Sequence, residues 1–112
     1  METITYLNFE WDKEKAKLNK IKHGISFKAA AKVFNDPNRL EDFDVFHSWD
    51  EERWQVIGMA DDILFVIYTE RRERFRIISA REATADERSR YYGRLGILHD
   101  ESGRTVDCGG ES

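Results

Sequence analysis

The residues of this sequence best suited to chemistry are the arginines of residues 69–84, which read TERRERFRIISAREAT. Five arginines fall between Arg71 and Arg81, in a chain whose formal net charge is −4. A guanidinium group presents a planar fork of donors that matches phosphate oxygens, and all eight cations of residues 71–94 are arginines. The group as a whole therefore favours an anion-binding surface, although any single arginine could instead be held in an exposed ion pair worth about 0–1 kcal/mol.

Strand periodicity divides this segment between two faces of a sheet. Regular alternation along RFRIISAR gives one set of Phe75, Ile77, Ser79 and Arg81, and another of Arg74, Arg76, Ile78 and Ala80. Because Phe75 and Ile77 belong in a core, we expect them to face the helices and Arg74 and Arg76 to lie on the uncovered face. We expect Arg81 to swing free as the strand ends. Both expectations depend on regular pleating through Ser79.

Groups for proton transfer and metal binding are less clearly marked. His23 ends a predicted helix, where an imidazolium is favoured by the helix dipole, so a capping role is the simpler reading. Glu51, Glu52 and Glu70 could serve as bases, but no spacing singles one out. The three histidines are scattered and Cys108 is the single cysteine, so we expect no metal site, no disulfide within the chain and no cofactor.

The net charge conceals a strong segregation. Residues 12–35 carry seven lysines against two acids, and residues 71–94 carry eight arginines against four acids. Residues 36–62 hold nine acids and two arginines, and the last eighteen residues add three further negative charges. An acidic chain can therefore still present a basic face to an anion.

The elements that must position these residues are indicated by periodicity and capping signals. The sequence predicts a strand over residues 4–11, a helix between Asp12 and Gly24, and a second helix from Ser26 to just before Pro37. Residues 40–46 are typical of an edge strand, and further strands are predicted over residues 53–59, 63–70 and 74–80. A last helix follows the capping box of Thr84 and Glu87, with Gly96 as its stop.

This pattern predicts an α+β fold with the order β-α-α-β-β-β-α. The sheet is expected to be antiparallel, of about four strands, with helices packed on one face. The length suits one domain, which we assign to residues 1–96, with residues 97–112 as a flexible tail. The longest apolar run, Ile63–Tyr68, is too short to cross a bilayer and no secretory signal is visible, so we expect a cytoplasmic protein without a membrane partner.

The motifs FEWD, KHGISF, RWQVIG, YTERRERFRIISARE and ATADERSRYY, in this order and spacing, resemble the BrnT family of bacterial toxins. The similarity runs from about Phe9 to Tyr92. It implies a compact fold similar to RelE-type ribonucleases, an RNA-cleaving activity that arrests translation, and inhibition by a BrnA antitoxin. Such antitoxins carry a ribbon-helix-helix DNA-binding part, so the resemblance also implies that operator DNA is contacted only through the antitoxin.

The resemblance also suggests which residues act. The matching motifs contain His23 in KHG, Arg53 before the IG strand, Tyr68, Thr69 and Glu70 in YTE, and Arg76, Ser79 and Arg81 in RIISAR. The sequence departs from the usual pattern at Arg72, where glycine is common in the hairpin turn.

These observations lead to a metal-independent endoribonuclease as the first hypothesis. RNA supplies its own nucleophile, the 2′-hydroxyl, so the protein must position the phosphodiester and stabilise its charge. Arg76 and Arg81 are the candidates for transition-state stabilisation, and His23 and Tyr68 for proton transfer. Supporting contacts to RNA phosphate are assigned to Arg53, Arg74 and Ser79.

Two other readings stay open at this point. The protein could be a non-catalytic basic module that binds an acidic or DNA-binding partner, in which case it forms a tight complex but cuts no RNA. It could also be a structural domain with surface ion pairs, in which case arginine substitutions change neither toxicity nor partner binding.

Overall fold

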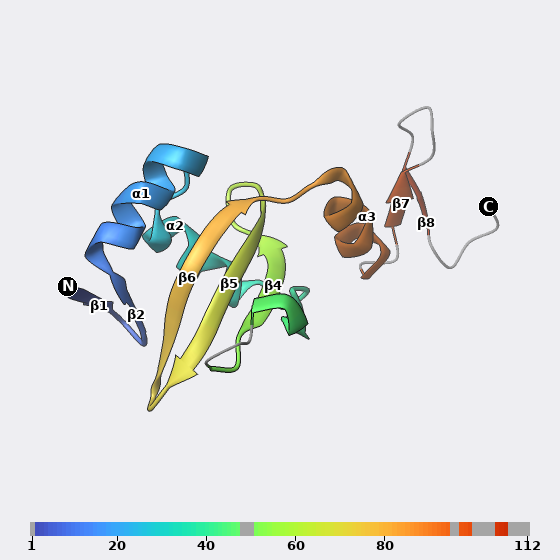
Figure 1. The fold of residues 1–112 in the computed structure, drawn as a ribbon. Coiled ribbons are helices and arrows are strands. Elements are labelled where there is room, and N and C mark those ends of the chain that lie inside the picture. Colours follow the sequence, from blue (N-terminus) through green and yellow to red (C-terminus); the bar gives the residue numbers. More distant parts are fainter. Residues whose placement is uncertain (1, 48–50, 95–96, 100–104, 108–112) are drawn as a thin grey trace.

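A mixed six-stranded sheet forms the centre of the computed structural model, which describes residues 2–47, 51–94, 97–99 and 105–107 (Figure 1). The strands are β1 (Thr3–Tyr6), β2 (Phe9–Asp12), β3 (Leu40–Phe43), β4 (Trp54–Met59), β5 (Ile63–Arg71) and β6 (Arg74–Glu82). Their order in the sheet is β1-β2-β6-β5-β4-β3. The α+β class is confirmed, and β3 lies at an edge as its acidic residues predicted.

The expectation of an antiparallel sheet of about four strands is wrong. The segment predicted as one strand turns at Leu7, whose φ is 56°, and forms the hairpin β1–β2. Strand β2 then pairs with β6 in parallel, while the other neighbouring strands pair antiparallel. Partners in the β2–β6 pair are separated by more than sixty residues, so no local signal announces it.

The helices begin and end close to the predicted positions. Helix α1 (Lys13–His23) begins after Asp12, whose carboxylate accepts from the Lys15 backbone N–H, and ends at Gly24 with φ 75°. Helix α2 (Phe27–Ala31) is capped by Ser26 and tightens into the 3₁₀ helix η1 (Lys32–Asn35). A short 3₁₀ turn, η2 (Val45–His47), follows β3, and α3 (Ala85–Arg94) follows β6. The predicted stop at Gly96 lies outside the described residues.

Helices cover both faces of the sheet, which corrects the prediction that they share one face (Figure 1). On the side of α1, α2 and η1, which we call the helix face, one core cluster includes Phe27, Val33, Val66 and Ile77. On the opposite side Tyr91 of α3 belongs to a second cluster. The physical reason is that β5 is buried along most of its length on both sides, so each side requires an apolar cover.

Two further strands, β7 (Ile97–His99) and β8 (Thr105–Asp107), pair antiparallel in a separate small sheet. Most of the segment predicted as a flexible tail lies outside the described residues, so its flexibility stays a prediction. In the described part of the chain, no helix is long and apolar enough to span a membrane.

Candidate active site

A β-bulge in β6 decides which arginines share a face. Ile67 of β5 lies opposite Ser79, whereas the next residue, Tyr68, lies opposite Ile77, so Ile78 is an extra residue in β6. The extra residue reverses the alternation from Ser79 onward. Ser79 and Arg81 therefore lie on the same side as Arg76, and not with Ile77 as regular pleating predicted.

The packing of the neighbouring residues confirms this reversal. Ala80 belongs to the cluster on the helix face, together with Ile77. Arg81 lies opposite Phe65 of the second cluster and places its guanidinium carbon 4.1 Å from the centre of the Phe65 ring. The side of the sheet away from α1 and α2 thus gathers four of the predicted site residues, and we call it the arginine face: Arg74, Arg76, Ser79 and Arg81.

Arg76 lies in a row of polar residues that crosses three strands on this face. Its partner on β2 is Glu10, whose Oε2 accepts a hydrogen bond of 2.7 Å from Arg76 Nη1, and its partner on β5 is Thr69. The Arg76 and Glu10 side chains are only 11% and 17% exposed. Arg53 directly precedes β4, and the pairing of Trp54 with Tyr68 places it beside Thr69. The row brings a carboxylate acceptor next to guanidinium donors.

Sequence reasoning did not single out Glu10. Its separation from Arg76 by 66 residues leaves no motif that joins the two. The one available signal was the alternation of FEWD, because Phe9 and Trp11 are buried on the helix face and Glu10 must point to the other side.

Arg81 is held in place, and the expectation that it swings free is wrong. Both of its terminal nitrogens donate to the Glu87 carboxylate, at 2.9 and 3.0 Å, and Nη1 also donates to the Glu82 carbonyl. Glu87 completes the predicted capping box, since Thr84 N–H donates to Glu87 and Thr84 Oγ1 accepts from the Glu87 N–H. Burial alone would raise the pKa of Glu87, but the bonds from Arg81 and Thr84 outweigh it and lower the pKa. The pair links the end of β6 to the start of α3.

Tyr68 is not brought together with Arg76. Its ring belongs to the cluster on the helix face, and its hydroxyl donates to Glu41 at 2.5 Å. Glu41 also forms an ion pair of 2.8 Å with Arg39. Burial and the hydrogen bond to the Glu41 carboxylate raise the pKa of Tyr68 above its usual 10.0, so the hydroxyl stays protonated at neutral pH.

His23 likewise lies away from the arginine face. It occupies the last turn of α1, one turn after Asn19. The Asn19 side chain donates to the Ala80 carbonyl at 2.8 Å and accepts from the Ala80 N–H at 3.1 Å, which docks α1 on the helix face of β6.

The turn arginines differ in their surroundings. Arg71 forms an exposed ion pair with Glu51, Arg74 is exposed, and Arg72 adopts a left-handed conformation with φ 57°. In the described parts of the chain, no group of three acidic, histidine or cysteine residues is arranged to hold a metal. The chemistry the arginine face itself offers is anion binding by guanidinium groups, with the Glu10 carboxylate beside Arg76 and the Glu87 carboxylate beside Arg81.

Comparisons with known proteins point to a defined family. Residues 11–87 match the family described as "Ribonuclease toxin, BrnT, of type II toxin-antitoxin system". The fold is similar to the crystal structure of the Brucella abortus ribonuclease toxin, BrnT, with a TM-score of 0.51 and 24% sequence identity, covering 66% of this chain and 92% of that chain. At that identity the likeness is one of fold. No curated protein matches the sequence.

Proposed function

Because this chain belongs to the BrnT family of ribonuclease toxins of type II toxin–antitoxin systems, we propose that its arginine face binds and cleaves RNA. As a toxin of such a system, the protein has RNA as its substrate and an antitoxin as its partner. The observation that carries the proposal is the bulge at Ile78, which puts Ser79 and Arg81 on the face that already holds Arg76.

The proposed reaction needs no nucleophile from the protein and no metal ion. The RNA 2′-oxygen attacks the neighbouring phosphorus, the bond to the 5′-oxygen breaks, and the products are a 2′,3′-cyclic phosphate and a 5′-hydroxyl. Glu10 accepts the 2′-hydroxyl proton, and water protonates the leaving 5′-oxygen. Arg76 donates to the phosphoryl oxygens as their charge grows, because Glu10 engages one of its five N–H donors and no other described residue accepts from it.

The remaining residues of the arginine face, together with Arg53, contact the RNA backbone. Arg74 and Ser79 lie on β6 on either side of Arg76, and Arg53 directly precedes β4, which suits contacts to the same or an adjoining phosphate. Arg81 lies five residues further along β6, which at about 3.3 Å per residue corresponds to roughly 16 Å. Such a distance suits a phosphate more than one nucleotide further along the chain, with Glu87 holding the guanidinium in place. Proton transfer is assigned to Glu10 in place of His23 or Tyr68, since those two side chains belong to the helix side.

We further propose that the antitoxin is of the BrnA type, with a ribbon-helix-helix part that alone contacts operator DNA, and that the toxin arrests translation in the cytoplasm. An apolar strip at the edge strand and the turn after it suits such a partner. Phe43, Val45 and Phe46 are all exposed there, Phe46 by 81%.

The test compares RNA cleavage by purified Arg76→Ala and Arg81→Ala variants with that by Arg90→Ala. Arg90 lies on α3 and forms an exposed ion pair with Asp42 of β3. Removing a donor to the developing charge should lower the cleavage rate of Arg76→Ala about 100-fold or more, whereas Arg90→Ala should stay near the wild type. Cleavage should also persist in excess EDTA. Wild-type cleavage by a folded Arg76→Ala protein would refute the assignment.

A further inference from the structure

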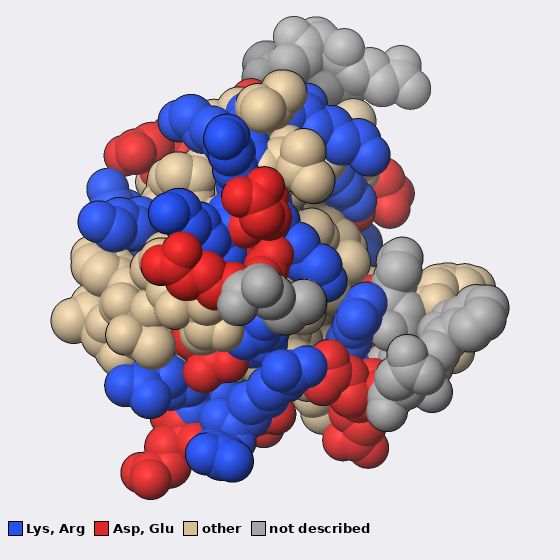
Figure 2. All heavy atoms as spheres, turned by 60° about the vertical axis from the view of Figure 1, so that its left-hand side comes forward, with Lys and Arg blue, Asp and Glu red and all other residues tan. Residues whose placement is uncertain are grey.

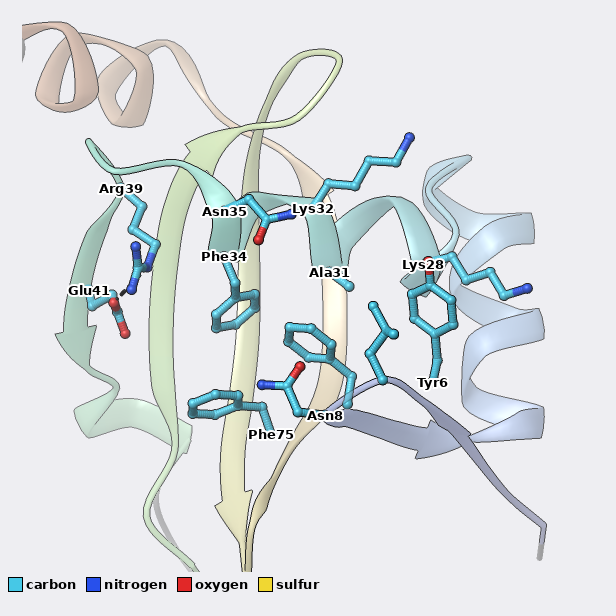
Figure 3. Close-up of a pocket in the computed structure, with 12 residues that line it drawn as sticks. Tyr6, Asn8, Lys28, Ala31, Lys32, Phe34, Asn35, Arg39, Glu41 and Phe75 are labelled. Carbon is cyan, nitrogen blue, oxygen red and sulfur yellow. Dashed lines mark ion pairs between the residues drawn. The ribbon is translucent and has the colours of Figure 1, made fainter.

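A pocket of about 230 Å³ opens on the helix face, between η1 and the β1–β2 hairpin (Figure 3). Its inner wall carries three phenylalanine rings, Phe9, Phe34 and Phe75, of which Phe34 and Phe75 stack at 5.5 Å with an angle of 22°. Figure 3 shows the amide of Asn35 above the Phe34 ring and that of Asn8 beside the Phe75 ring. We call this hollow the aromatic pocket.

The rim of the aromatic pocket is basic. Lys28 and Lys32 extend outward from α2 and η1, and both are exposed (Figure 3). Arg39 on the opposite side is paired with Glu41, whereas neither lysine forms an ion pair with any described residue. Seen from the side on which α1 lies, basic side chains are spread over much of the surface with acids between them (Figure 2). Lys28 Nζ lies 5.3 Å from the centre of the Tyr6 ring, another side chain of the lining. The pocket thus combines aromatic rings, amides and two ammonium groups without an ion-pair partner among the described residues.

We propose that the aromatic pocket binds one nucleobase of the RNA substrate, with the adjoining phosphate on Lys28 and Lys32. Bases of single-stranded RNA stack on aromatic side chains, and amide groups both donate to and accept from base edges. Ammonium groups at the rim suit the phosphate that each nucleotide carries. This inference rests on the proposed function, because it assigns a subsite to the same substrate.

The pocket is connected to the arginine face around the end of the sheet. Leu7 and Asn8, which line the aromatic pocket, also line a second hollow with Glu73 and Arg74. The Phe75 N–H donates to the Asn8 carbonyl at 3.0 Å and holds the tips of the two hairpins together. A single strand can therefore run from the arginine face, past Arg74, into the pocket.

An acidic segment of a protein partner is the competing occupant. It would use the lysines, but the paired donor and acceptor groups of Asn8 and Asn35 beside the phenylalanine rings match a base more closely. The test must separate these two occupants.

The probe is a short, fluorescently labelled single-stranded RNA with 2′-O-methyl riboses. The protein cannot cleave it, because the 2′-oxygen that would act as the nucleophile is blocked. The double variant Lys28→Glu/Lys32→Glu should bind it at least tenfold more weakly than the wild type. The matched control is Lys17→Glu/Lys22→Glu, which makes the same charge change on exposed residues of α1 outside the pocket. We expect less than a threefold loss for this control.

Base recognition is tested with oligonucleotides that lack one base at successive positions. For the wild type, one abasic position should weaken binding about tenfold, in line with the range for stacking on a protein ring. Phe34→Leu keeps an apolar side chain but removes the stacking surface. This variant should bind the intact RNA about tenfold more weakly than the wild type does, and removing the base should not weaken its binding further.

The outcomes distinguish this inference from the proposed function. In cleavage assays the lysine double variant should raise KM and leave kcat unchanged, whereas Arg76→Ala should lower kcat. Unchanged RNA affinity of the lysine variant, with Arg76→Ala inactive, would overturn the base subsite and leave the active site standing. If the lysine double variant no longer formed the antitoxin complex but kept its RNA affinity, the base subsite would also be overturned and the pocket assigned to the antitoxin. If the lysine double variant lost RNA affinity but no abasic position weakened binding to the wild type, the site would contact phosphate alone, and base binding would be refuted.

Discussion

Glu10 and Arg76 lie directly opposite each other on the parallel strands β2 and β6, with Glu10 Oε2 2.7 Å from Arg76 Nη1. Both side chains are mostly buried. Each charge stabilises the other, because a buried charge without a partner raises the free energy of the folded state. The pair therefore contributes both to the fold, by joining β2 to β6, and to the proposed chemistry.

The losses of unfolding free energy caused by Arg76→Ala and by Glu10→Ala should not be additive. Each single change leaves the other charge without its partner and should lower the free energy of unfolding by about 3 kcal/mol. The double variant should lose less than the sum of the two single changes. Urea denaturation of the three variants and the wild type measures this coupling. Additive losses would show that the 2.7 Å contact carries no interaction energy.

Replacing Glu10 by glutamine should separate catalysis from binding. The amide keeps the shape of the side chain but cannot accept a proton, so kcat for RNA cleavage should fall about 100-fold while KM changes little. The matched control is Glu14→Gln, on an exposed residue of the first turn of α1, which should leave both constants unchanged. Wild-type kcat for Glu10→Gln would exclude Glu10 as the proton acceptor.

Replacing the turn residue Arg72 by glycine should stabilise the folded protein. Arg72 has a φ of 57°, a conformation that costs a residue with a Cβ about 1–2 kcal/mol and glycine almost nothing. After the greater freedom of glycine in the unfolded chain is subtracted, Arg72→Gly should raise the free energy of unfolding by about 0.5 kcal/mol. Arg72→Ala, which keeps the Cβ, should show no such gain in the same thermal or urea unfolding experiment.

The link between β6 and α3 should make stability depend on acid pH. The folded-state pKa of Glu87 is lowered below its usual 4.5, so its contribution is fully present above about pH 4.5 and is lost as the pH falls through the lowered value. Glu87→Gln should cost about 1 kcal/mol at pH 7 and flatten the decline in unfolding free energy below pH 4.5. Urea midpoints at pH 7, 4 and 3 measure both effects. An equally steep decline in the variant would assign the acid sensitivity to other carboxylates, such as Asp36 and Asp62, whose pKa values are also lowered.

Local signals in the sequence were sufficient for most elements of the fold. The capping residues Asp12, Ser26 and Thr84 mark the starts of the three α-helices, because each side chain accepts from a backbone N–H of the first turn. The hairpins between β4 and β5 and between β5 and β6 could also be predicted from local signals, because a turn and its flanking strands are adjacent in the chain. The concentration of arginine around β6 likewise indicated where anions bind.

Two features of the candidate site depend on partners that are distant in sequence or on a change of register. Whether Arg81 shares a face with Arg76 depends on the single extra residue Ile78, and a bulge is selected by how β6 fits against β5 and α1 and not by its own alternation. Glu10 becomes the partner of Arg76 because β2 pairs in parallel with a strand 66 residues away, while Phe9 and Trp11 of β2 pack in the core cluster on the helix face. Composition and periodicity supply the charged groups and the strands, and long-range packing decides which groups meet.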